Sequence, residues 1–348
     1  MTSGPVCVLH AGTEKTGSTS LQHALRLNAD TLAAQGIWVP RALVGPPAVL
    51  ACNHIRLSTA SRFTGPTPDD LQRAQGLTSM ADVPGHRAEV IAALAAEHAA
   101  LPFAPRLILV SNEHVHSRLR ALPDLTRARD LLAPFCASFR VVTYLRRQDD
   151  LAASIAAMML RHGATTARLV PDFNTPHGFD DVLGVDAGYF DYAALLDRLE
   201  AVFGAASLSV RLYQPALDVV ADFFTAIGVD SAGLRRPARQ NTGLDARGMA
   251  LLLRLNAEIA AHPPLVELRH RLLPHLATRA AETLPAPGAA AFLARYAATN
   301  EAVRRRWFPA RPHLFAPLPA ATAPLPVPLD DAQTAALVQA LLAPGRTA

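Results

Sequence analysis

The chain has 348 residues, 50% of them hydrophobic and 18% charged, which excludes a disordered chain and allows one large domain with or without an extension. The formal net charge of +4 is mild, and its cations are interspersed with acids, which suits a small polyanionic ligand better than a nucleic acid. The arginines at 304–306 have no second basic and aromatic cluster nearby, so we expect a solvated helix end there.

Strands and helices are predicted to alternate over residues 1–230. An apolar run at 6–10 predicts a strand, and leucines at helical spacing after the polar loop at 12–20 predict a helix. Further strands are expected at 106–111, 139–145 and 208–213, and further helices at 86–100, 151–160, 192–203 and 217–227. This series predicts the α/β class, with a P-loop-type parallel β-sheet flanked by helices.

The remaining segments are expected to lie outside this core. Residues 40–85 are rich in Pro, Gly, Ser and Thr without periodicity, which indicates an insertion or a loop on the substrate side. Residues 231–348 show helical patterns and a Pro-rich stretch, followed by a last helix at 330–342. We therefore predict an α/β core at 1–230 and a helical C-terminal extension at 231–348 that packs on it.

Three polar sets follow three predicted strands. They are the loop from Gly12 to Ser20, the sequence Asn112-Glu113-His114, and Arg146. Ligands of open parallel sheets bind beyond the carboxyl ends of the strands, so the three sets are predicted to converge at one edge.

The loop at 12–20 has the features of a phosphate site. Its glycines allow close backbone approach, and the following helix begins with free N–H groups and a positive dipole end. A plainer interpretation is that Ser18 or Thr19 caps the helix, since Thr19-x-x-Gln22 matches a capping box. Capping does not account for Lys15, the only lysine in the chain and a compact, mobile cation of the kind that can follow a single oxygen as its charge grows.

The position of Lys15 distinguishes this loop from that of nucleoside triphosphatases. Their loop reads G-x-x-x-x-G-K-[ST], with the lysine after the second glycine. Here Gly17 is followed by Ser18, and the strand at 106–111 does not end in an aspartate that would support a metal ion. ATP or GTP hydrolysis is therefore the weaker interpretation.

Lys15-Thr-Gly-Ser-Thr-Ser20 resembles the 5′-phosphosulfate loop of the sulfotransferase superfamily. A second motif of that family has an arginine at a strand end and a serine eight residues later, which Arg146 and Ser154 match. The resemblance implies a 3′-phosphoadenosine 5′-phosphosulfate (PAPS) donor as co-substrate and no metal. Lys15 would contact the bridging oxygen of the cleaved S–O bond, Thr16, Gly17, Ser18, Thr19 and Ser20 would hold the 5′-phosphate, and Arg146 and Ser154 would bind the 3′-phosphate.

Two further features bear on this resemblance. Arg146 could instead form a surface ion pair with Asp149 or Asp150. In that case Arg147 could bind the 3′-phosphate in its place. The segment 190–213, followed by Arg239-x-Asn241, also resembles bacterial sulfotransferase-like proteins; whether Arg239 and Asn241 contact the donor stays open.

Sulfuryl transfer also needs a group that accepts the proton of the attacking hydroxyl. Family members use a glutamate or a histidine, and the strand end supplies Glu113 and His114. Glu113 is preferred because a glutamate is ordinarily ionised at neutral pH, whereas His114 would have to be neutral. His10 is a third candidate, although a buried core histidine is the plainer interpretation. The pattern Glu113-His114-x-His116 has no distant partners that would complete a metal site.

The sequence thus predicts a sulfotransferase acting on the hydroxyl of a glycan, glycolipid or small metabolite. The alternatives are a P-loop nucleotide-dependent kinase and a non-catalytic nucleotide-binding relative. Residues 40–85 and 163–190 are the expected acceptor loops, but neither they nor the rest of the chain identify the acceptor or the oligomeric state. Three cysteines without metal or redox spacing and the lack of a long apolar run predict a cytoplasmic protein that makes no stable membrane insertion.

Overall fold

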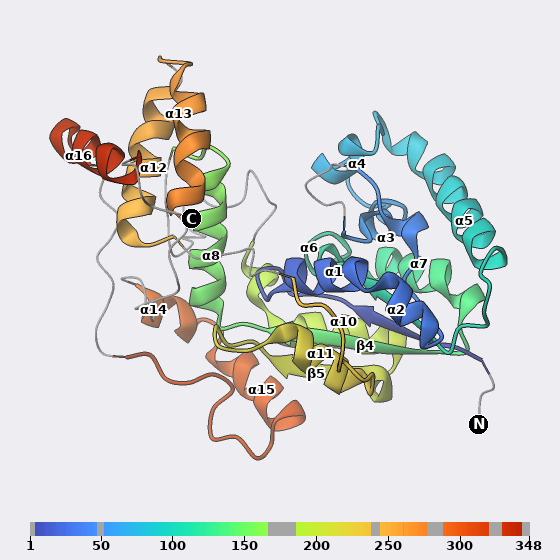
Figure 1. The fold of residues 1–348 in the computed structure, drawn as a ribbon. Coiled ribbons are helices and arrows are strands. Elements are labelled where there is room, and N and C mark those ends of the chain that lie inside the picture. Colours follow the sequence, from blue (N-terminus) through green and yellow to red (C-terminus); the bar gives the residue numbers. More distant parts are fainter. Residues whose placement is uncertain are drawn as a thin grey trace. The chain divides into compact units, whose positions relative to one another are not determined.

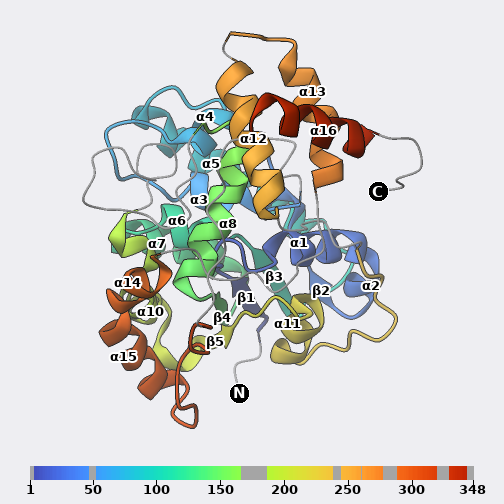
Figure 2. The ribbon, with the colours of Figure 1, turned by 90° about the vertical axis from the view of Figure 1, so that its left-hand side faces the viewer.

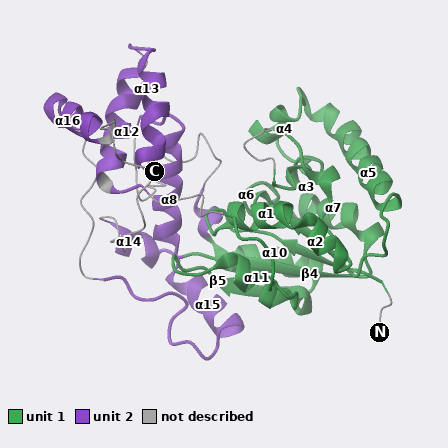
Figure 3. Ribbon diagram, in the orientation of Figure 1, with its two compact units in different colours: residues 1–146, 191–240 green, residues 147–190, 241–348 purple. Residues whose placement is uncertain are grey.

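The computed structural model describes residues 4–46, 52–165, 186–237, 244–259, 261–276, 288–319 and 329–342. The chain divides into two compact units, one of residues 1–146 and 191–240 and one of residues 147–190 and 241–348 (Figure 3). The predicted domain boundary at residue 230 stays a prediction, and the compact units divide the chain at residues 147, 191 and 241.

A parallel sheet forms the centre of the first unit. Its strands are β1 (Val6–His10), β2 (Ile37–Trp38), β3 (Leu107–Ser111), β4 (Ser138–Leu145) and β5 (Leu208–Leu212). They lie in the order β2-β3-β1-β4-β5; Figure 2 labels all five strands, and Figure 1 labels β4 and β5. His10 at the end of the central strand lies opposite Ser111 on one side and Val142 on the other, so three strands end close together. The predicted α/β class with a parallel sheet flanked by helices is confirmed.

The first unit also contains nine described α-helices, some of which pack on this sheet. They are α1 (Ser18–Leu27), α2 (Ala29–Ala34), α3 (Ile55–Thr59), α4 (Asp70–Ala74), α5 (Val83–Ala99), α6 (His114–Arg118), α7 (Leu122–Leu132), α10 (Tyr192–Phe203) and α11 (Val219–Ile227). Leu21 and Leu25 of α1 and Phe223 of α11 join Val8 of β1 in one buried core. Helix α10 packs on β4, β5 and α7. Because helices bury the central strands, these strands read as continuous apolar runs rather than as alternating ones.

The segment at 40–85 differs from the expected loop. It contains α3 and α4, and apolar side chains such as Ile55, Leu57 and Leu71 are buried. Strand β2 and helix α7 were not predicted either. Two residues of β2 and five of α3 are too few for a hydrophobic period to show in the sequence.

The second unit is helical. It contains α8 (Gln148–Arg161), α12 (Ala246–Ile259), α13 (Leu265–Leu272), α14 (Ala289–Ala294), α15 (Ala297–Trp307) and α16 (Asp331–Leu342). Leucines of α8, α12 and α13 form its core. Phe190 packs edge to face on Phe292 of α14. Across all described residues, no helix has both the length and the apolar character needed to cross a membrane.

Candidate donor and transfer site

The loop between β1 and α1 is hydrogen-bonded to the end of β4. The backbone N–H of Thr13 donates to the carbonyl oxygen of Tyr144 at 3.0 Å, and the N–H of Tyr144 donates to the carbonyl of Gly12 at 2.8 Å. The hydroxyl of Thr143 donates to the same Gly12 carbonyl at 2.7 Å. Within the loop, the Thr16 hydroxyl donates to the Thr13 carbonyl at 2.6 Å. These contacts fix the backbone on either side of Lys15.

Glycines occupy two positions where the loop makes close approaches. Gly12 has φ 92°, and a Cβ there would lie 3.0 Å from the carbonyl oxygen of Glu113. Gly17 has φ 86°, and a Cβ there would lie 3.0 Å from a methyl group of Val219. The backbone of Lys15 is also in the left-handed region, with φ 61°, a conformation that residues other than glycine rarely adopt.

Helix α1 begins without a side-chain cap, which corrects the capping-box interpretation. Gly17 is the N-cap residue, and no side chain of the described residues forms a capping hydrogen bond. The Gln22 amide donates instead to the carboxylate of Glu113. The first N–H groups of the helix therefore have no capping partner, and they point beyond its N-terminus. Both the free donors and the positive end of the helix dipole favour an anion there.

Ser18 supplies a second, independent sign of a ligand. Its side chain is 4% exposed, and its buried hydroxyl has no hydrogen-bond partner among the described residues. Leaving a buried hydroxyl unpaired costs about 1–3 kcal/mol. A phosphate oxygen at the N-terminus of α1 would satisfy both the hydroxyl and the uncapped N–H groups.

Arg146 contacts the loop directly. Its Nη1 donates to the carbonyl oxygen of Lys15 at 2.7 Å, and its guanidinium lies over the ring of Tyr213, 5.2 Å from the centroid. Tyr192 donates a hydrogen bond to the Arg146 carbonyl. The alternative of a surface ion pair between Arg146 and the aspartates that follow it is therefore not what the structure shows.

Arg147 makes that ion pair instead. It lies 2.6 Å from Asp149 and 3.2 Å from Asp150 within the second unit. Ser154 is half-buried on α8 of the same unit. Its predicted role at the 3′-phosphate stays a prediction, and so does that of Arg146. Arg239 and Asn241 lie outside the described residues, as do residues 47–51 and 166–185 of the expected acceptor loops.

The three candidate bases differ in their surroundings. Glu113 is 9% exposed, and its Oε2 accepts hydrogen bonds from the amides of Gln22 and Asn53. His10 is fully buried, with Nδ1 2.8 Å from the hydroxyl of Ser111, and burial lowers its pKa to about 4. His10 is therefore neutral at pH 7 and packs among aromatic rings of the core.

His114 contacts the loop between β1 and α1. Its Nδ1 lies 3.1 Å from Oε1 of Glu14, and the hydroxyl of Ser117 donates to the same oxygen at 2.8 Å. Burial lowers the pKa of His114, but the hydrogen bond to Glu14 and the charges of Glu113 and Glu14 outweigh burial and raise it. Sequence reasoning missed Glu14 and Ser117. The only available signal was that Glu14 directly precedes Lys15.

The structure thus brings together the loop, the Glu113–His114 pair and Arg146 at one edge of the sheet, as the strand ends predicted. This is an α/β protein in which the uncapped start of α1 lies beside a carboxylate and a histidine.

The chain is distantly similar to a protein of known structure. The crystal structure of a sulfotransferase from Alicyclobacillus acidocaldarius is similar to this chain with a TM-score of 0.43 and 17% sequence identity, and the match covers 79% of this chain and 96% of that chain. No protein-family model matches the chain, and no curated protein matches it.

Proposed function

We propose that the chain is a PAPS-dependent sulfotransferase that transfers a sulfuryl group to a hydroxyl of a glycan, glycolipid or small metabolite. The observation that carries the proposal is the anion site at the start of α1, where the uncapped helix and the buried hydroxyl of Ser18 lie directly after Lys15. The order of these residues supports a phosphosulfate rather than a triphosphate, because the lysine precedes the second glycine.

The residues at this edge of the sheet fit the two ends of such a donor. In this proposal the backbone N–H groups at the start of α1 and the hydroxyls of Ser18, Thr19 and Ser20 would hold the 5′-phosphate, whereas the Thr16 hydroxyl already donates to the Thr13 carbonyl. Arg146 supplies a cation at the end of the neighbouring strand, and its buried Nε has no hydrogen-bond partner among the described residues. Through Nη1 the same side chain holds the Lys15 carbonyl, so it also positions the loop.

The donor supplies an activated sulfuryl group with a phosphate as its leaving group. The oxygen of the acceptor forms a bond to sulfur while the bond from sulfur to the bridging oxygen breaks, and the electron pair stays on the phosphate. Lys15 stabilises this developing negative charge by an electrostatic contact that strengthens in the transition state. Glu113 or His114 takes the proton of the acceptor hydroxyl, and no covalent intermediate is needed.

Two measurements test this function on the purified full chain. The first is calorimetry with 3′-phosphoadenosine 5′-phosphate and, separately, with ATP and magnesium. Binding of the bisphosphate supports the proposal, and binding of ATP that requires magnesium would favour the kinase. The second is turnover of labelled PAPS in a metabolite and glycan extract, followed by mass spectrometry for the gain of one sulfuryl group. Bisphosphate binding without any turnover would identify the non-catalytic relative.

Lys15→Ala tests the role of the lysine. Loss of one charge-stabilising donor lowers turnover about 10²–10³-fold in comparable sites. Arg106→Ala is the matched control, since Arg106 is an exposed cation at the opposite, amino end of the sheet, where it donates to the Gln35 carbonyl. We expect Lys15→Ala to lose turnover and Arg106→Ala to keep it. Wild-type turnover by Lys15→Ala would contradict the mechanism.

A further inference from the structure

An acidic residue inside the donor loop contacts the histidine of the neighbouring strand end. Glu14 and His114 are 100 residues apart in the chain, yet Oε1 and Nδ1 lie 3.1 Å apart. Both side chains are largely buried, 13% and 12% exposed. Ser117, one turn along α6, donates to the same carboxylate oxygen at 2.8 Å. The Glu14 carboxylate thus accepts a hydrogen bond from Ser117 and lies against one nitrogen of the imidazole.

The two nitrogens of His114 have different surroundings. Nδ1 faces Glu14, whereas Nε2 is buried and has no hydrogen-bond partner among the described residues. At neutral pH a carboxylate is ionised and can accept hydrogen bonds but not donate them. Glu14 therefore favours the His114 tautomer with the proton on Nδ1. In the neutral ring this leaves the lone pair on Nε2. Oε2 of Glu113, by contrast, already accepts two amide N–H groups.

We propose that Glu14 is a positioning residue for the base of the transfer reaction, holding the Nδ1–H tautomer of His114 so that Nε2 accepts the proton of the acceptor hydroxyl. This inference rests on the proposed sulfuryl transfer. When the acceptor oxygen bonds to sulfur, its proton moves to Nε2, and the imidazolium that forms is stabilised by Glu14. The electron pair of the broken S–O bond goes to the phosphate beside Lys15. Atoms and charges balance without another reactant.

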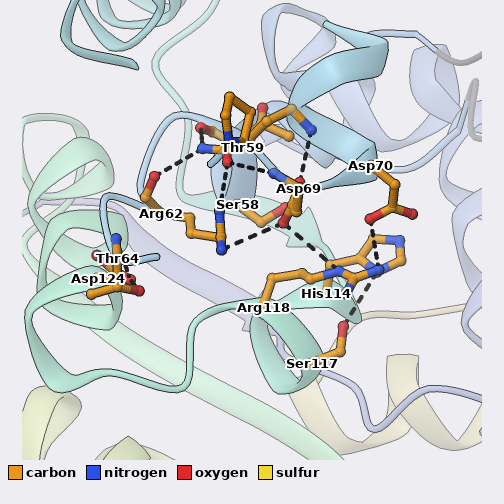
Figure 4. Close-up of polar contacts among 12 residues, drawn as sticks. Ser58, Thr59, Arg62, Thr64, Asp69, Asp70, His114, Ser117, Arg118 and Asp124 are labelled. Atoms are coloured by element: carbon orange, nitrogen blue, oxygen red, sulfur yellow. Dashed lines mark hydrogen bonds and ion pairs between the residues drawn. The ribbon is translucent and has the colours of Figure 1, made fainter. Parts of the chain in front are cut away.

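The charged groups around His114 raise or lower its pKa according to the sign of their charge. The carboxylates of Glu14 and Glu113 raise its pKa, and Arg118 on the same helix lowers it, in addition to the lowering by burial. Arg118 is itself paired with Asp70 at 3.0 Å and lies 3.9 Å from Asp69, and both aspartates come from the α4 region (Figure 4). Replacing Glu14 by a neutral residue therefore lowers the pKa of His114.

This coupling links donor and acceptor chemistry. Glu14 is the direct neighbour of Lys15, so one loop conformation places both the cation for the leaving group and the carboxylate for the base. The hydrogen bonds that fix this loop in the folded protein therefore also fix the position of the Glu14 carboxylate beside His114. The arrangement resembles in principle the carboxylate–histidine pairs of hydrolases, where loss of the carboxylate changes the tautomer and lowers turnover by orders of magnitude.

Glu14→Gln tests the proposal because it keeps the size of the side chain and removes its charge. The active form has neutral His114, so wild-type kcat/KM rises with pH through the pKa of His114. We expect Glu14→Gln to move this acidic limb to lower pH by about half a unit or more, and to lower kcat about tenfold or more. Affinity for 3′-phosphoadenosine 5′-phosphate should change less than about threefold. Glu14→Asp should restore part of the rate.

A titration by NMR gives a readout that does not depend on turnover. In protein with ¹⁵N-labelled histidine, the signals of His114 are assigned by their loss in His114→Gln. They should report the Nδ1–H tautomer in wild type and a lower pKa in Glu14→Gln. Glu97→Gln is the matched control, because Glu97 is also a carboxylate that accepts several hydrogen bonds, from Trp38, Arg41 and Ala42. It should leave the titration of His114 and the pH profile unchanged.

Different results would overturn the role of Glu14 and the proposed function. If wild type transfers sulfuryl groups and Glu14→Gln matches its rate and pH profile, the role of Glu14 is overturned and the function stands. An Nε2–H tautomer in wild type overturns it equally. If wild type binds no bisphosphate and transfers nothing, the proposed function fails and the role of Glu14 fails with it.

Discussion

Ser18→Ala should have opposite effects on stability and on donor binding. The hydroxyl of Ser18 is buried and has no partner among the described residues, so its removal relieves a desolvation penalty of about 1–3 kcal/mol. Part of that gain is lost with the packing of the oxygen atom. We expect the free protein to keep its stability or to gain up to about 1 kcal/mol. Binding of the bisphosphate should weaken by about 1.5–3 kcal/mol, the usual contribution of a hydrogen bond to a charged group, which is roughly 10- to 150-fold in Kd.

Ser58→Ala is the matched control for the same chemical change. Ser58 is also buried, but its hydroxyl donates to the Ile55 carbonyl at 3.0 Å and accepts from Asn112 at 3.1 Å. This variant should lose about 1 kcal/mol of stability and retain bisphosphate affinity. Urea denaturation measures the first quantity and calorimetry the second. The reasoning is refuted if Ser18→Ala is destabilised as much as Ser58→Ala and still binds the bisphosphate like wild type.

Two other predictions concern Arg146 and the buried histidines. Arg146→Ala should weaken binding of the bisphosphate by about 2 kcal/mol, or roughly 30-fold, and equal affinity in this variant and the exposed control Arg140→Ala would contradict it. Burial lowers the pKa of His10 and that of His54 from 6.5 to about 4, so the folded protein binds these protons less readily than the unfolded chain. Stability is therefore full above pH 6.5 and falls as the pH decreases toward 4, by about 2 kcal/mol for each histidine at pH 5. Urea denaturation at pH 7 and pH 5 measures this fall, which should be smaller in His10→Gln; an equal fall in both proteins would argue against it.

Most of the sheet could be predicted from the sequence because its central strands are largely buried. The runs at 6–10, 106–111 and 139–145 are short, largely apolar series, which is the signal of a central parallel strand. The edge strand β5 is half-buried and alternates apolar and polar residues, which is the other pattern that predicts a strand. The convergence of the loop with Glu113 followed from the same pattern. Strands that run parallel end at one edge, so the position of each polar set was determined once the class of sheet was known.

The partners of the site residues could not be predicted in the same way. Gln22 stands at the right distance from Thr19 for a capping box, but its amide binds Glu113, which is 91 residues away. Arg146 is close to two aspartates in the sequence. It directly follows β4, however, and its side chain donates to the carbonyl of Lys15. Spacing in the sequence can only suggest partners that are close in the chain. The partners that these side chains bind lie far away in the sequence, and the fold brings them close.

The conformation of Lys15 connects these contacts to the chemistry. A left-handed φ at a residue with a Cβ costs about 1–2 kcal/mol. Hydrogen bonds on both sides of the residue offset this cost, through Thr16 to the Thr13 carbonyl and through Arg146 to the carbonyl of Lys15 itself. Because folding supplies the energy that orders this backbone, donor binding does not have to supply it. The same backbone carries Glu14 toward His114, so a loop fixed for leaving-group stabilisation also fixes the orientation of the base.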